Sequence, residues 1–256
     1  MSKICKKRAN YRRHRGFLKG RYGIILLIFL FFALITGYFF LYTDFFAIRE
    51  IVVHGNDYIE EKEIIKLSHI DLGMNIFMLN KSNVEDKIRR HSFVKEASVS
   101  LELPDRIILT IQERDLSCII PFEDGIFIYI DEEGVVLEKS QVLKSYNYPL
   151  ITGLEDVSFL VGKTIDITPS WLKNALLSIV ILLEKNQLSQ HISEIHVLED
   201  YSIQLYTKSG SVIIVGDDAI LEKKINFVKT FVSQELPNSI VDISHGGDPV
   251  SKPRNN

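Results

Sequence analysis

Apolar residues follow different patterns on the two sides of Tyr42. Residues 23–42 contain no charged residue and no proline, and Thr36 is the main polar interruption. A helix rises about 1.5 Å per residue, so this stretch covers about 30 Å, the thickness of a bilayer's hydrocarbon core. Tyr38, Tyr42 and Phe45 gather at its C-terminal end, where aromatic rings favour the membrane boundary. We therefore predict a transmembrane helix over residues 23–42.

A cleaved signal peptide is the main alternative for an apolar segment at this place. Signal peptides have a shorter apolar core, followed by a cleavage site with small residues at fixed positions. Here the segment ends in Tyr-Phe-Phe-Leu-Tyr-Thr-Asp, which offers no such site. The sequence therefore favours an uncleaved anchor in the lipid bilayer.

The distribution of charge predicts the orientation of this anchor. Residues 1–22 carry nine Lys and Arg side chains and no acidic one, and all 33 Asp and Glu residues follow the span. Basic residues beside a span stay in the cytoplasm, which makes residues 1–22 a cytoplasmic tail and places the rest outside. This position explains the basic tail as a topology signal that contacts anionic lipid, and we expect no nucleic-acid binding.

Periodic patterns after the span predict a first outer unit at residues 45–114. One strand-like pattern is followed by two helical patterns and then by two more strand-like patterns. The second helix has a capping box formed by Ser82 and Glu85. The expected elements lie at residues 51–53, 60–68, 82–90, 97–103 and 107–111. The unit is therefore β-α-α-β-β, with two short helices on one face of its sheet.

A second outer unit is predicted at residues 115–250. Short strands are expected at residues 116–121, 126–130, 135–137, 195–197, 203–206, 212–215 and 239–244. Amphipathic helices are expected at residues 168–185 and 217–236, and residues 149–153 and 162–163 belong to a loose connection. The fold class is α+β with a mostly antiparallel sheet. Residues 251–256 are predicted to be disordered, so nothing after residue 244 would cover the edge of the last strand.

Groups that could perform catalysis do not gather in the sequence. The outer histidines lack H-E-x-x-H or another ligand spacing, no G-x-S-x-G elbow occurs, and there is no glycine-rich phosphate loop. Cys5 and Cys118 are expected on opposite sides of the membrane and cannot pair, and Cys118 is expected to be a small buried side chain. We predict no enzyme activity, no metal and no cofactor.

Several short motifs occur in a fixed order along the chain. They are Phe46-x-Ile48-x-x-Ile51-x-Val53-x-Gly55-Asn56, Gly73-Met74-Asn75-Ile76-Phe77, Phe93-Val94-x-x-Ala97-x-Val99, Leu103-Pro104-Asp105-Arg106-Ile107, Gln112-Glu113-Arg114, residues 130–136 and Ile240-Val241-Asp242-Ile243. With the basic tail and single span, this order resembles the FtsQ/DivIB family of bacterial cell-division proteins. The first outer unit resembles a polypeptide-transport-associated (POTRA) domain.

This resemblance implies a non-catalytic scaffold at the division septum, in the plasma (inner) membrane. Its partners would be other membrane division proteins of the FtsL and FtsB/DivIC type, docked by strand addition to a C-terminal edge strand. The expected partner-binding residues are Ile240, Val241, Asp242, Ile243, Ser244 and His245.

Two other functions are compatible with a membrane-anchored POTRA unit. A substrate-handling protein of a secretion or outer-membrane assembly system would need a following barrel of alternating strands, and two amphipathic helices interrupt such a pattern. A cell-wall hydrolase would need a catalytic constellation, which the sequence lacks.

Overall fold

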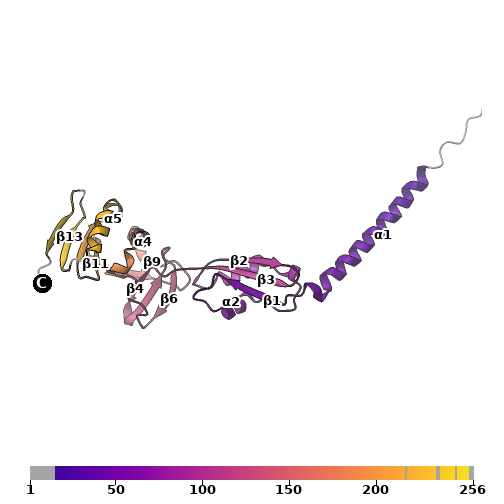
Figure 1. The fold of residues 1–256 in the computed structure, drawn as a ribbon, viewed down its shortest axis with the longest axis horizontal. Helices are drawn as coiled ribbons and strands as arrows, with labels where there is room; N and C mark the ends of the chain where they lie inside the picture. The colour runs from indigo at the N-terminus through magenta and orange to yellow at the C-terminus, as the bar shows by residue number, and fades with distance from the viewer. Residues whose placement is uncertain (1–14, 217, 235–236, 246, 254–256) are drawn as a thin grey trace, which may run out of the picture.

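The computed structural model describes residues 15–216, 218–234, 237–245 and 247–253, which form an extended arrangement of three parts (Figure 1). A long helix, α1 (Arg15–Tyr42), leads into a small sheet-and-helix unit, and a larger sheet follows with the C-terminus at the far end. Within α1, Tyr22–Phe40 is an exposed apolar stretch of 19 residues with mean hydropathy 2.6. A helix long and apolar enough to cross a membrane therefore lies where the sequence predicts one. The predicted tail before Arg15 lies outside the described residues.

The first outer unit has the predicted β-α-α-β-β order. After the short turn η1 (Asp44–Phe46), its elements are β1 (Glu50–His54), α2 (Glu61–Ser68), η2 (Ile76–Met78), α3 (Lys81–Ile88), β2 (Val94–Glu102) and β3 (Arg106–Glu113). Strand β3 is central, parallel to β1 and antiparallel to β2. On one face Val99 lies opposite Leu109 and both are buried, whereas Ser98 on the other face is exposed. Helices α2 and α3 cover the buried face.

The predicted cap of α3 is wrong. Asn80, two residues before Ser82, caps the helix with its side-chain oxygen, which accepts a backbone N–H of the first turn at 3.2 Å. Asparagine is as good an N-cap as serine, so the helix can start earlier. Glu85 has a different partner, because its carboxylate accepts the N–H of Val99 at 3.0 Å. This bond occupies a donor on the outer edge of β2.

The end of β3 holds the turn that follows β1. The Glu113 carboxylate accepts the backbone N–H groups of residues 57–59 at 3.1, 2.7 and 2.8 Å. Gly55 opens this turn with a φ of +80°, and a Cβ atom there would lie 2.1 Å from the carbonyl oxygen of Ile111. Glycine is therefore required at position 55, because the strand and the turn approach too closely for a side chain.

The second unit is built on one nine-stranded sheet. Its strands are β4 (Cys118–Phe122), β5 (Ile126–Ile130), β6 (Val136–Ser140), β7 (Leu150–Thr152), β10 (Ile192–Val197), β11 (Ile203–Thr207), β12 (Val212–Gly216), β13 (Ser239–Asp242) and β14 (Val250–Pro253). Their order in space is β14-β13-β12-β11-β10-β7-β4-β5-β6. Strand β7 pairs in parallel with β4 and β10, β13 pairs in parallel with β12, and the other neighbours are antiparallel. A mixed, mostly antiparallel sheet is confirmed.

Strand β7 corrects the prediction of a loose connection at residues 149–153. It lies in the middle of the sheet, where Ile151 is buried opposite Ile195 of β10. Three residues are too few to show an alternating pattern, and Pro149 and Gly153 on either side are typical of a turn. Two further short strands, β8 (Asp156–Ser158) and β9 (Asp166–Thr168), pair with each other in a separate ribbon.

Two amphipathic helices cover one face of the large sheet. Helix α4 (Ser170–Lys185) and helix α5 (Asp218–Ser233) contribute to the same hydrophobic core as the sheet. A row of buried residues in register crosses five neighbouring strands on this face: Ile151, Ile195, Leu205, Ile213 and Val241. This row extends the core from β7 to β13, so the last strands of the sheet are fixed to its centre.

A cluster of charges joins the two outer units. Arg114, directly after β3, contacts Asp131 at 2.5 Å and Glu133 at 2.7 Å in the turn between β5 and β6. Lys95 of β2 contacts Glu132 at 3.3 Å and Glu133 at 3.0 Å in the same turn. The Asp131 side chain is only 3% exposed, so the first contact is a largely buried ion pair. These contacts hold the turn of the large sheet against the end of the first unit.

Candidate partner-binding edge

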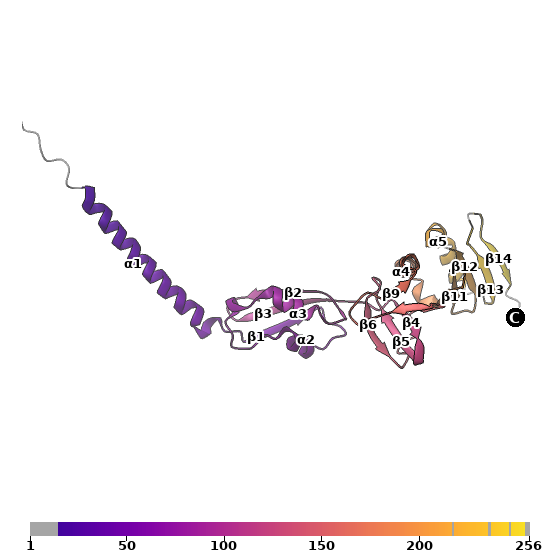
Figure 2. The same ribbon diagram turned by 180° about the vertical axis from the view of Figure 1, so that it is seen from behind.

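The predicted last strand, β13, is not the edge of the sheet. Strand β14 pairs with it in antiparallel register, with Asp242 opposite Val250 and Ile240 opposite Lys252. Figure 2 shows β14 at the outer end of the sheet, beside the C-terminus. The expectation that nothing after residue 244 covers β13 is therefore wrong, and so is the expectation of disorder for Ser251–Pro253, which belong to β14. Residues 254–256 lie outside the described residues.

Strand β14 was missed because its side chains carry no pattern of burial. All four residues, Val-Ser-Lys-Pro, are exposed, and the strand is held by backbone pairing to β13. The sequence does contain one signal for a hairpin. Residues 246–249, Gly-Gly-Asp-Pro, are strong turn formers between Ile243 and Val250.

The two edges of the large sheet differ in how far they are covered. At the β6 edge, the N–H of Val136 donates to the carbonyl of Lys163 at 2.9 Å, and the N–H of Gly162 donates to the carbonyl of Val136 at 2.8 Å. Residues 162–165 thus cover the start of β6. Among the described residues, β14 has β13 as its one strand neighbour, which leaves its outer edge open. An edge strand of this kind exposes backbone donors and acceptors that another chain can pair with.

The edges of the small sheet are partly occupied. Glu85 accepts the Val99 N–H on the β2 side. On the β1 side, the chain just before the strand pairs with the loop before η2. The N–H of Ile48 donates to the carbonyl of Met74 at 2.9 Å, and the N–H of Gly73 donates to the carbonyl of Ile48 at 2.8 Å. The β14 edge is therefore the more accessible site for strand addition.

Strand β13 gives β14 a rigid base. Val241 and Ile243 are fully buried in the core, and the N–H of Ile243 donates to the carbonyl of Ile214 at 2.9 Å, which continues the pairing with β12. At the other end of the strand, the N–H of Ser239 donates to Ser211 Oγ at 3.0 Å. Both ends of β13 are thus fixed to the preceding part of the sheet.

The loop between β13 and β14 is held by side chains from both sides. Asp242 Oδ1 accepts the Ser244 hydroxyl at 2.7 Å and the Ser244 N–H at 2.9 Å. These bonds favour the charged carboxylate and lower the pKa of Asp242. Lys224 of α5 donates from Nζ to the carbonyl oxygens of His245 and Gly247, each at 2.6 Å. The path of the chain into β14 is therefore fixed by α5.

The six predicted site residues lie together but differ in how far they are exposed. Val241 and Ile243 are buried, Ser244 is half-buried and His245 is exposed. Ile240 and Asp242 lie half-buried on the sheet face away from the helices, because Val241 between them points into the core. Lys252 and Val250 of β14 continue that face, since they lie directly opposite Ile240 and Asp242.

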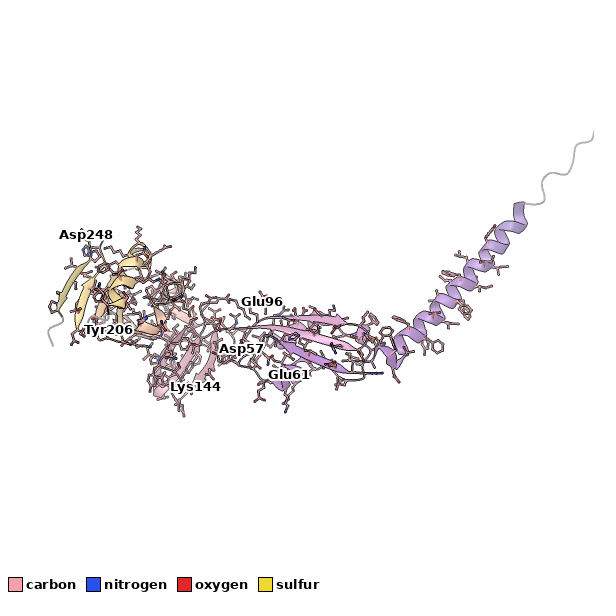
Figure 3. The ribbon with its side chains drawn as sticks, viewed as in Figure 1. Asp57, Glu61, Glu96, Lys144, Tyr206 and Asp248 are labelled. Atoms are coloured by element: carbon pink, nitrogen blue, oxygen red, sulfur yellow. The ribbon has the colours of Figure 1, made fainter. Side chains whose placement is uncertain are left out.

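The uncovered face continues across the sheet as a polar surface. Thr152 of β7 hydrogen-bonds to Glu194 and, at 2.7 Å, to His196 Nδ1, both on β10. The His196 ring packs edge-on against Tyr206 of β11, whose centroid is 6.2 Å away (Figure 3 labels Tyr206). His196 is thus a hydrogen-bonded surface residue, and its neighbours are a hydroxyl, a carboxylate and a phenol ring.

The metal-ligating side chains of the described residues are scattered, and the one described cysteine is buried. In the part of the chain that the structure describes, no three His, Cys, Asp or Glu side chains are grouped so that they could hold a metal ion. Cys118 is fully buried, as predicted, and burial raises the pKa of its thiol far above the ordinary value. A thiol in this state is a poor nucleophile.

Two family models match the chain, one for each outer unit. The "POTRA domain, FtsQ-type" model matches residues 46–114, and the "Cell division protein FtsQ/DivIB, C-terminal" model matches residues 121–244. The second match ends before β14.

Relatives that match most of the chain agree with these two models. The chain is 30% identical to the cell division protein DivIB of Clostridium tetani, over 80% of this chain and 79% of the relative. It is 30% identical to DivIB of Bacillus subtilis, over 76% and 70% of the two chains. It is 26% identical to the cell division protein FtsQ of Syntrophotalea carbinolica, over 82% and 74%.

Proposed function

This chain belongs to the FtsQ/DivIB family of bacterial cell-division proteins, and from that premise we propose that it is a non-catalytic scaffold of the division septum. It links other membrane division proteins, of the FtsL and FtsB/DivIC type, through the C-terminal end of its large sheet. The observation that carries this proposal is the open edge of β14 on a sheet whose opposite edge, β6, is partly covered.

Strand addition gives this edge a binding mechanism. A partner strand pairs with the free backbone groups of β14, and main-chain hydrogen bonds supply the affinity. Side chains on the adjoining face, Ile240, Asp242, Val250 and Lys252, select the partner's alternate side chains. The lysine and Pro253 weaken non-specific pairing, because a charged side chain and a missing N–H both blunt an edge.

The place of β14 constrains the kind of partner. The edge lies at the end of the molecule farthest from α1 (Figure 1). A partner anchored in the same membrane must extend past the whole first outer unit before it reaches β14. A long helical segment, as in a coiled coil, spans such a distance and can end in a strand. This supports single-span coiled-coil proteins as partners.

The orientation of the anchor follows from charge. We propose that residues before α1 are cytoplasmic and that both outer units are extracytoplasmic, because all nine basic residues of the first 22 precede the apolar stretch. A reporter that is active only outside the cytoplasm, fused after Asn256, should be active. Activity only from a cytoplasmic reporter would reverse the orientation.

Proline substitution in β14 tests the docking edge. Neighbouring residues in a strand point their N–H groups to opposite sides, so Ser251→Pro and Lys252→Pro remove one donor facing β13 and one facing outward. The variant that loses the outward donor should stay folded and inserted but lose its division partners on co-purification, and cells that depend on it should form filaments. Ser251→Ala, at a position outside the four selecting side chains, keeps the backbone donor and should retain the partners. Retention of partners by both proline variants would place the interface elsewhere.

A further inference from the structure

Aromatic rings join the first outer unit directly to the end of the apolar helix. Phe40, the last residue of the apolar stretch of α1, has its ring centroid 4.2 Å from that of Phe46 and 5.7 Å from that of Phe77. Phe46 and Phe77 are themselves 5.2 Å apart. Rings of η1 and η2 therefore pack against the end of the apolar stretch.

Three segments of the first unit meet at this end. Ala47, after η1, forms a β-bridge with Asn75, just before η2. The turn between β2 and β3 adjoins them, because the N–H of Arg49 donates to the carbonyl of Asp105 at 2.8 Å. Figure 1 shows these segments at the end of the small sheet that faces α1. They form a tip, which we define as residues 44–46, 76–78 and 103–105.

The tip exposes four large apolar side chains. Phe45 is 63% exposed, Phe77 42%, Met78 54% and Leu103 56%. Removing these side chains from water would stabilise the protein by about 25 cal/mol for each Å² of apolar surface buried. Single exposed apolar residues are ordinary, but a group of four at one end marks an interaction surface.

Charged groups adjoin the tip at the neighbouring ends of β1, β2 and β3. Arg106 contacts Glu50 at 2.8 Å and Glu102 at 3.1 Å, and Arg49 lies 3.8 Å from Asp105. The sequence of layers is therefore apolar helix, aromatic and apolar tip, then mixed charges. This is the order of layers in a membrane, from acyl chains through the interface to the headgroups.

We propose that the tip inserts into the interfacial layer of the outer leaflet, so that the first outer unit binds lipid as well as being tethered by α1. Phe40 sets the depth, because its ring belongs to the span and contacts two rings of the tip. Insertion of Phe45, Phe77, Met78 and Leu103 holds the unit against the bilayer and directs the large sheet away from it. The inference takes α1 as a membrane anchor and does not depend on partner docking at β14.

Tryptophan fluorescence in lipid vesicles tests this inference on the full chain. Trp171 is first replaced by phenylalanine, and a new tryptophan is introduced by Met78→Trp or, separately, by Leu103→Trp. Both side chains are exposed, so the substitutions leave the core intact. Tyr58→Trp is the matched control, because Tyr58 is 70% exposed and follows Asp57, which Figure 3 shows at the opposite end of the unit.

The protein is reconstituted in vesicles of phosphatidylethanolamine and phosphatidylglycerol that contain lipids with a doxyl quencher at shallow or deep positions. We expect blue-shifted emission from residues 78 and 103, and at least twofold stronger quenching by the shallow quencher than for residue 58. The proposal would be overturned if residues 78 and 103 showed the same emission and the same quenching as residue 58. The tip would then be a surface for another protein.

Discussion

Arg114 Nη1 donates a hydrogen bond at 2.5 Å to Asp131 Oδ2, and this pair joins the first outer unit to the second. The same nitrogen reaches Glu133 Oε2 at 2.7 Å. Asp131 also accepts the N–H groups of Glu133 and Val135, at 3.0 and 2.7 Å, so one carboxylate shapes the turn and binds the neighbouring unit. This contact therefore connects the turn between β5 and β6 to the end of β3.

Loss of the arginine should loosen the junction. Arg114→Ala leaves the buried Asp131 carboxylate without its cation, and a hydrogen bond to a charged group contributes roughly 1.5–3 kcal/mol. We expect urea unfolding at lower concentration and a broader distance distribution between spin labels at Lys62 and Lys139. Arg106→Ala, which breaks exposed ion pairs with Glu50 and Glu102, should change stability much less, because solvent screens these charges. Equal effects of both variants would contradict the role of Arg114.

The same junction should respond to acid. Hydrogen bonds from Arg114, then from Lys95, lower the pKa of Glu133 below its ordinary value. A carboxyl group whose pKa is lower in the folded state stabilises the fold at pH values above its unfolded pKa, about 4.3, and this contribution is lost as the pH falls through the folded pKa. Glu133→Gln should therefore lower the free energy of unfolding less at pH 3 than at pH 7. Urea unfolding of the variant and the parent protein at the two pH values measures this difference.

Glu113 should be important for the first unit although it is at the surface. Glu113→Ala removes the acceptor of three backbone N–H groups at residues 57–59. Water can replace it at the two exposed donors, but the N–H of the buried Ile59 is left unpaired, which costs roughly 1–3 kcal/mol. Glu102→Ala loses an exposed ion pair and should cost less than about 1 kcal/mol. Chemical denaturation separates the two, and a Glu113→Ala variant as stable as Glu102→Ala would disprove the role of the carboxylate.

Two glycines with similar backbone angles should tolerate alanine differently. Gly55 and Gly73 have φ values of +80° and +89°, so alanine is strained by about 1–2 kcal/mol at either position. At Gly55 the new Cβ would also collide with the carbonyl oxygen of Ile111, whereas nothing lies within 4 Å at Gly73. Gly55→Ala should unfold the first unit, and Gly73→Ala should lower its melting temperature slightly. Similar melting of both variants would refute the close approach.

The register of β2 and β3 makes a further prediction. Val99 and Leu109 face each other in the core, so Val99→Asp or Leu109→Asp buries an unpaired carboxylate. This costs several kcal/mol, a large share of the roughly 5–15 kcal/mol that stabilises a domain. Ser98→Asp places the charge on the exposed face and should be tolerated. Melting curves that coincide for all three variants would show that the register is wrong.

The sequence was sufficient for elements with a repeated pattern. Strands β2 and β3 alternate over eight or nine residues, and the helices α4 and α5 have apolar stripes, so their type and face follow from periodicity. The long apolar helix is equally clear, because residues 23–42 contain no charged residue and no proline.

The parts that escaped prediction lack such a pattern. Strand β7 is three residues long and owes its place to neighbours on both sides, and β14 is exposed along its whole length. Arg114 lies at the predicted boundary of the two units, but its partner Asp131 lies 17 residues away in a turn, and spacing alone could not pair them. The predicted site residues therefore lie on and just after β13, one strand before the open edge of the sheet.

Site-specific photo-crosslinking at the sheet edges tests the central claim most directly. A benzoyl-phenylalanine residue is introduced at Ser251 or Lys252 on β14 and, as a control, at Lys139 on the opposite edge strand β6. In dividing cells the β14 positions should crosslink to a single-span division protein of the FtsL or FtsB/DivIC type, identified by mass spectrometry, and Lys139 should not. Crosslinks to that partner from Lys139, with none from β14, would contradict docking at the C-terminal edge.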